Sequence, residues 1–262
     1  MEAVAATAPP ADEALAARTR AGEQAFTSLY GPHFEGVYDY VLRLVGEREL
    51  AADVARETFG RARRAFAEQG SDIAAWLFST ARLCALEALR YRRDRNGDVR
   101  EALQLTRVDA DRTPAAEVVF DRELVELVCE TAAALSRDEY SLFALEVRHD
   151  FPAAEIGEHL GLNGAVSTRL TRIRDAFDQA VGCELVARRG RHNCAELDIL
   201  TREDAGRRVA QHVSRCARCQ GSMRRFVSPS EVLGALAFVE PPRELRREIF
   251  RRSRRPRVFG IL

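Results

Sequence analysis

The 262-residue sequence contains no lysine, so its 40 basic residues are all arginine, and 40 acidic residues balance them. Alanine, glycine and valine are abundant, which is typical of GC-rich coding, and the arginine count alone is therefore weak evidence of phosphate binding. The zero net charge hides an uneven distribution. Residues 183–262 are basic overall, whereas residues 123–182 are acidic.

Long apolar runs are also missing: no window approaches eighteen uninterrupted apolar residues, which argues against a membrane span. The first twenty residues lack the basic start, apolar run and cleavage site of a secretory signal. We therefore expect a cytoplasmic protein. In that reducing compartment the six cysteines do not predict a disulfide framework.

The alternating apolar pattern of β-strands is missing, whereas apolar residues recur at three- and four-residue spacing almost throughout. This pattern predicts an all-α fold. No glycine-rich phosphate loop, nucleophile elbow or paired His-Glu metal motif occurs in a supporting context, so we expect no enzymatic activity.

Composition and helix signals divide the chain into six segments. The predicted segments are a loose leader (1–20), a helical block (21–93) with helices over about 24–45, 47–68 and 72–93, a polar linker (94–116), a second helical block (117–182), a cysteine-containing segment (183–226) and a basic tail (227–262).

The second block contains the pattern of a helix-turn-helix. One short helix ends at Gly161, and another begins at Asn163 and reaches Phe177. A glycine-containing turn followed by a helix with polar leading residues is typical of DNA-binding modules. A generic helical hairpin has the same outline, so the spacing alone leaves DNA binding open.

Both blocks resemble parts of the extracytoplasmic-function (ECF) sigma factors of bacterial RNA polymerase. Residues 26–46, 51–59 and 75–82 are similar to region 2, and residues 133–177 are similar to region 4. The resemblance implies a promoter-recognition subunit that binds core RNA polymerase and promoter DNA. The alternative is a sigma-like protein-interaction regulator that has lost promoter binding, which the acidic second block favours.

The resemblance assigns polymerase binding to the helix that contains residues 51–59. Its polar residues at three- and four-residue spacing share one face, which suits a protein partner of mixed charge. An ordinary solvated face has the same pattern. The candidates are Asp53, Arg56, Glu57 and Arg61.

The resemblance also assigns two promoter contacts. Arginines that hold phosphates, beside an aromatic or a loop that accepts an unstacked base, suit the opening −10 element, although basic residues also suit a helix C-terminus. The −10 candidates are Gln69, Ser71, Arg82, Arg90, Tyr91, Arg92 and Arg93. The −35 candidates, on the leading part of the recognition helix, are Asn163, Ser167, Thr168, Arg169 and Arg172.

The cysteine-containing segment carries a metal-binding pattern. On a helix, His212 and Cys216 lie one turn apart and Cys219 follows three residues later, so the three donors can converge on a tetrahedral ion. A closed site needs a fourth donor, for which Cys194 is the first choice, with Cys183 and His192 as alternatives. Three sulfurs and one imidazole fit zinc best.

This motif resembles that of the zinc-associated anti-sigma domains. The resemblance implies a structural zinc module, fused in cis, that packs against region 2 or region 4 and regulates access to polymerase. A second hypothesis is a redox sensor, because zinc-bound thiolates can be oxidised with loss of the metal. A separate anti-sigma factor is a further partner that the sequence leaves open.

The tail contains an apolar stretch over 232–239, then Pro241 and Pro242, then a basic amphipathic helix over 245–257. Such a helix suits nucleic acid, anionic lipid or an acidic partner. The acidic second block is a candidate partner within the same chain, and a solvated arginine-rich tail is the alternative.

Overall fold

The computed structural model describes residues 22–65, 73–96, 121–162, 164–203 and 206–251. These residues form helices, and no strand occurs among them, so the predicted all-α fold is confirmed. Within the same ranges, no helix combines the length and the apolar character needed to span a membrane. The predicted leader and most of the predicted linker lie outside the described residues.

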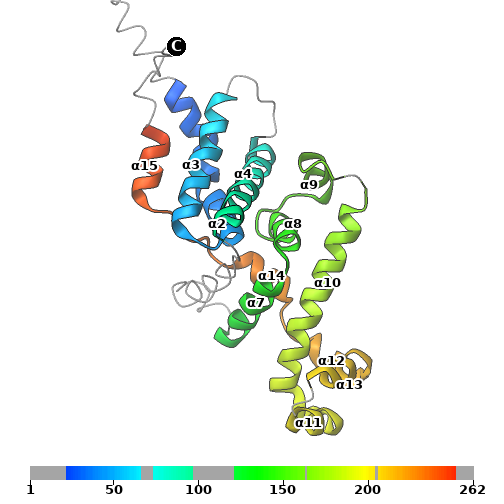
Figure 1. Ribbon diagram of the computed structural model, residues 1–262. Coiled ribbons are helices and arrows are strands. Elements are labelled where there is room, and N and C mark those ends of the chain that lie inside the picture. The colour runs from blue at the N-terminus through cyan, green and yellow to red at the C-terminus, as the bar shows by residue number, and fades with distance from the viewer. Residues whose placement is uncertain (1–21, 66–72, 97–120, 163, 204–205, 252–262) are drawn as a thin grey trace, which may run out of the picture.

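The first module is a helical bundle. A helix over 22–30 is followed by η1 (Gly31–His33), α2 (Phe34–Val45), α3 (Arg48–Arg64) and α4 (Ile73–Asn96), and α3 packs against both α2 and α4 (Figure 1). The expected single helix over 24–45 is interrupted at η1, where Pro32 has no backbone N–H to donate. Gly46, with a φ of 76°, ends α2 in the left-handed conformation that glycine favours.

The second module consists of α7 (Arg122–Ala134), α8 (Arg137–Val147), α9 (Ala153–His159) and α10 (Val166–Leu185). A capping box starts α8: the Ser136 hydroxyl accepts from the Glu139 backbone N–H, and the Glu139 carboxylate accepts from the Ser136 backbone N–H. α9 and α10 form the helix-turn-helix, but α10 begins at Val166, later than expected. It continues beyond residue 182, where the sequence predicted a boundary.

A small third module sits at the end of α10 (Figure 1). It contains the π-helical η3 (Val186–Gly190), η4 (Arg191–Asn193), α11 (Ala195–Arg202), α12 (Gly206–Arg215) and α13 (Ala217–Met223). The module packs so closely on α10 that a Cβ added at Gly182 would lie 2.6 Å from the sulfur of Met223. Its own buried core includes Val186, Leu197 and Val213.

Residues 227–251, which we call the strap, return from the third module to the first. The strap contains α14 (Pro229–Ala235), an extended stretch over 236–242 and α15 (Arg243–Arg251). α14 packs on α7, α8 and α10, whereas α15 lies beside α3 (Figure 1). The suggestion that the basic helix binds the acidic second block is therefore wrong for α15, whose buried Leu245 and Ile249 pack on the first module.

A buried ion pair joins the first module, the second module and the strap. Arg148 Nη2 lies 3.0 Å from Asp39 Oδ2, and both side chains are fully buried. Arg148 also donates to the carbonyl of Leu233 at 2.6 Å, and Asp39 accepts from the backbone N–H of Val239 at 3.0 Å. Burial alone would raise the pKa of Asp39, but Arg43 and Arg148 hold it below its usual value.

We predict that Arg148→Met lowers the free energy of unfolding by about 3–5 kcal/mol, because it leaves a buried carboxylate without one of its two cationic partners. Urea denaturation of the full chain measures the change. The control is Arg122→Met, which removes an exposed ion pair with Glu126 and should cost less than about 1 kcal/mol. Equal stability of the two variants would contradict the prediction.

Candidate functional site

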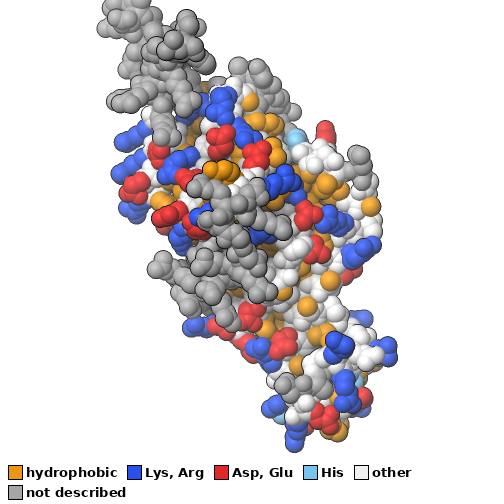
Figure 2. Space-filling model, viewed as in Figure 1, with side chains coloured by type: hydrophobic (Ala, Val, Ile, Leu, Met, Phe, Trp, Pro, Cys, Tyr) orange, Lys and Arg blue, Asp and Glu red, His pale blue; other side chains and the backbone are white. Residues whose placement is uncertain are grey.

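The four polymerase candidates on α3 form a paired, mixed-charge surface. Arg56 Nη1 lies 2.6 Å from Asp53, and Arg61 Nε lies 2.9 Å from Glu57. Arg61 also reaches Glu87 on α4 at 2.8 Å. Basic and acidic side chains are interspersed over this part of the molecule (Figure 2). The hydrogen bond from Arg61 lowers the pKa of Glu57, so its carboxylate stays charged at neutral pH.

The strap occupies one edge of this surface. Glu248 Oε2 accepts from Arg56 Nε at 2.8 Å, and the carbonyl of Ile249 accepts from Arg63 at 2.8 Å. The Phe250 ring contacts an aromatic cluster of the first module, with centroid distances of 5.9, 5.6 and 5.8 Å to Phe26, Phe34 and Phe59. Sequence reasoning missed these contacts, because residues almost 200 positions apart leave no local signal.

The −10 candidates whose side chains are described fall at two places along α4. Arg90 and Tyr91 are exposed near the end of α4, where Arg92 pairs with Glu47. Arg82 lies eight residues earlier, about 12 Å along the helix at 1.5 Å per residue. The remaining candidates are not described in full: Gln69 and Ser71 lie outside the described residues, as does the side chain of Arg93.

The −35 candidates that the structure describes lie on the first turns of α10. Ser167, Thr168 and Arg172 are exposed, and Thr168 and Arg172 line a surface pocket together with the preceding turn. Arg169 is engaged instead, with its Nη2 2.7 Å from Asp138 Oδ2. Asn163 lies outside the described residues.

Asp138, at the start of α8, connects the two sets of DNA candidates. One carboxylate oxygen pairs with Arg82 of the first module, and the other pairs with Arg169. Burial would raise the pKa of Asp138, but the hydrogen bond from Arg169 and the charge of Arg82 lower it, which keeps the bridge ionised at neutral pH. Sequence reasoning did not identify this residue, because an exposed acid in a helical first turn is common.

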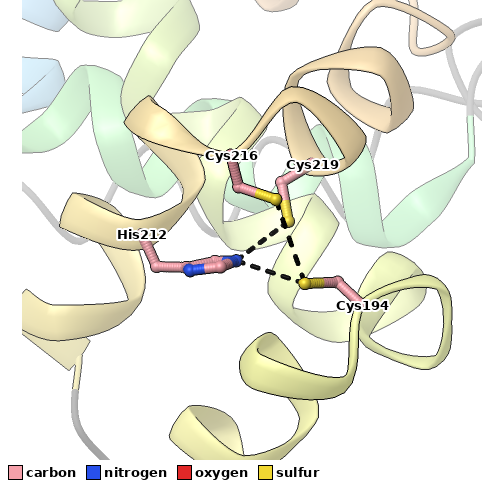
Figure 3. A group of neighbouring side chains, drawn as sticks. All are labelled: Cys194, His212, Cys216 and Cys219. Atoms are coloured by element: carbon pink, nitrogen blue, oxygen red, sulfur yellow. Dashed lines mark hydrogen bonds between the residues drawn. The ribbon is translucent and has the colours of Figure 1, made fainter.

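The four metal candidates converge in the third module (Figure 3). The ligand atoms of Cys194, His212, Cys216 and Cys219 all lie within 4.8 Å of one another. The His212 Nε2 atom is 3.3 Å from the Cys194 sulfur and 3.4 Å from the Cys219 sulfur, and the sulfurs of Cys194 and Cys216 are 4.0 Å apart. This donor set suits tetrahedral metal coordination.

The two alternative fourth donors lie elsewhere. The Cys183 thiol on α10 is buried and accepts a hydrogen bond from the Gln179 amide at 3.0 Å. His192 is exposed on η4. Neither belongs to the group of converging donors, so the structure brings Cys194 to the site.

The expectation that His212 and Cys216 share one helix is wrong. α12 ends at Arg215, and Cys216 has an extended backbone at the N-terminus of α13, with Cys219 in the first turn of that helix. The backbone N–H groups of Cys219 and Arg218 lower the pKa of the Cys216 thiol to about 7, because a helix N-terminus favours negative charge. The break therefore presents Cys216 in a form suited to metal binding.

Glu196 supports the imidazole of His212. Its Oε1 lies 3.3 Å from His212 Nδ1, which leaves Nε2 facing the sulfurs of Cys194 and Cys219. A carboxylate on the far nitrogen fixes the tautomer and the orientation of a ligating ring. Sequence reasoning missed Glu196, although its position two residues after Cys194 was an available signal.

Comparison with known proteins identifies the first module. Residues 29–95 match the sigma-70 region 2 family. The chain is 30% identical over 159 residues to the ECF RNA polymerase sigma factor BldN of Streptomyces coelicolor, an alignment that covers 59% of this chain and 60% of BldN. The chain thus spans less than two thirds of that relative.

A second relative gives a similar result. The chain is 29% identical over 149 residues to the ECF RNA polymerase sigma factor SigL of Mycobacterium tuberculosis, covering 55% of this chain and 81% of SigL. No solved structure matches. Residues 29–95 are therefore a sigma-70 region 2 domain, in a chain that is similar to ECF sigma factors over more than half of its length.

Proposed function

We propose that the chain is an ECF-type sigma factor that binds core RNA polymerase and directs promoter recognition and opening. The match of residues 29–95 to sigma-70 region 2 carries this proposal. The mixed-charge surface of α3 supports polymerase binding, and the exposed first turns of α10 support binding of the −35 element. In this role the protein positions DNA and polymerase without covalent chemistry of its own.

The alternative is a sigma-like regulator that has lost promoter binding. Its support is the acidic second module, because phosphate attraction supplies much of DNA affinity. Run-off transcription with core RNA polymerase and a library of promoter fragments separates the two functions. Specific transcripts support the sigma factor, whereas polymerase binding without transcripts supports the regulator.

The third module, in this proposal, holds a structural zinc ion and regulates the sigma factor in cis. Cys194, His212, Cys216 and Cys219 would be its ligands, and four protein donors leave no position for an activated water. Packing of this module on α10 supports a regulatory link to the −35 contacts. A redox-sensing role, in which oxidation of the thiolates releases zinc, is the second hypothesis.

We predict that Arg172→Ala weakens promoter binding by the holoenzyme and reduces the slope of log affinity against log salt by about 1, because one phosphate contact is lost. Arg172 is exposed on α10 and no ion pair engages it among the described residues. Fluorescence anisotropy at several salt concentrations measures the slope. Arg207→Ala, on the exposed face of α12, is the charge-matched control, and an equal change in both variants would contradict the assignment.

The purified chain should contain about one zinc ion, as expected for a single four-ligand site. Cys194→Ser should lose most of it, whereas Cys183→Ser should retain it because Cys183 lies outside the converging group. Elemental analysis after dialysis measures the zinc content. Retention of zinc by the Cys194 variant, or equal loss in both, would rule out the assigned ligand set.

Glu196→Ala should weaken zinc affinity by about 10- to 100-fold, the usual effect of removing a partner of a ligating histidine. Competition with a chromogenic chelator measures the affinity. The matched control is Glu203→Ala, because Glu203 is exposed in the same module and pairs with Arg208 rather than with a metal candidate. Unchanged affinity in the Glu196 variant would show that the contact with His212 is incidental.

A further inference from the structure

We propose that the strap is an autoinhibitory clamp, which holds the two promoter-binding modules closed and must release α3 before polymerase binds. The inference rests on the proposed function, and it concerns the strap rather than the metal module that precedes it.

The described conformation cannot serve both promoter elements. Arg82, a −10 candidate, and Arg169, a −35 candidate, pair with the same carboxylate, that of Asp138. The two elements lie about 25 base pairs apart, which is about 85 Å along DNA at about 3.4 Å per base pair. Two side chains that share one carboxylate cannot reach both, so the modules must separate in the promoter complex.

The first attachment of the strap is to the second module. Asp178 on α10 accepts hydrogen bonds from the backbone N–H and hydroxyl of Ser230, at 2.8 and 3.0 Å, which fixes the start of α14. Further along, α14 passes so close to the end of α8 that a Cβ at Gly234 would lie 2.3 Å from the carbonyl oxygen of Val147. Only glycine fits this approach without a backbone shift.

The second attachment is at the junction between the modules. The Phe238 ring stacks on His149, with centroids 5.3 Å apart, and His149 packs against Phe78 of the first module at 4.4 Å. The strap backbone also makes one hydrogen bond to each member of the buried Asp39–Arg148 pair, through the Leu233 carbonyl and the Val239 N–H. Separation of the modules would expose this pair and remove these partners, so the strap favours the closed state.

The third attachment is on the candidate polymerase surface. Glu248 holds Arg56, and the Phe250 ring fills the aromatic cluster beside α3. A polymerase that contacts Arg56 must displace Glu248. The competing segment belongs to the same chain, so only molecules in which the strap is released can bind polymerase. The apparent affinity for polymerase is therefore the intrinsic affinity multiplied by the fraction of released molecules.

The test uses the full chain with the double variant Gly234→Val/Phe250→Ser, which removes one attachment on each module without altering a promoter or polymerase candidate. Glu244→Gln, on the exposed face of α15, is the control. Hydrogen exchange follows the α15 amides, small-angle X-ray scattering follows opening of the modules, and biosensor titration with core RNA polymerase follows affinity. Circular dichroism and zinc content confirm that each variant is folded.

We expect the double variant to show faster exchange in α15, a larger radius of gyration and at least about tenfold tighter polymerase binding, which corresponds to about 1.4 kcal/mol. The control should behave as the wild type. Unchanged exchange in the double variant would overturn the assigned attachments. Faster exchange with unchanged polymerase affinity would overturn autoinhibition while the proposed function stands. If no protein binds polymerase although α15 is released, the proposed function itself fails.

Discussion

The arrangement of the modules depends on the buried contact between Asp39 and Arg148. Removing two charged groups from water is costly, and the cost is offset only when their remaining hydrogen-bonding groups find partners. Those partners come from different segments: Arg43 from α2, and the backbone groups of Leu233 and Val239 from the strap. The pair therefore keeps these partners only when both modules and the strap are together, which couples their positions.

The metal-ligand set could be predicted from the sequence, but the backbone path that presents it could not. The spacing of His212, Cys216 and Cys219, with Cys194 upstream, identified the donors that the structure brings together, because short spacings restrict where side chains can lie. The same spacing suggested a continuous helix, whereas the chain breaks at Cys216 and begins a new one. A ligand set can be predicted without the backbone path that presents it, since extended and helical segments both allow convergence.

Contacts between distant segments were not readable. The charge of the tail suggested an acidic partner, but apolar and aromatic packing of Ile249 and Phe250 directs α15 to the first module. The bridge from Asp138 to Arg82 and Arg169 likewise depends on how two modules meet. Periodicity fixes which face of a helix is apolar and leaves open which other face will cover it.

The position of the strap along the chain has a consequence for the order of assembly. Translation completes both helical modules before it reaches residues 227–251, and domains generally fold as they leave the ribosome. Each newly made molecule therefore passes through an interval in which both modules have been synthesised but the strap has not. If the strap is autoinhibitory as proposed, a nascent chain would meet polymerase without this restraint, and recently synthesised molecules would be the active ones.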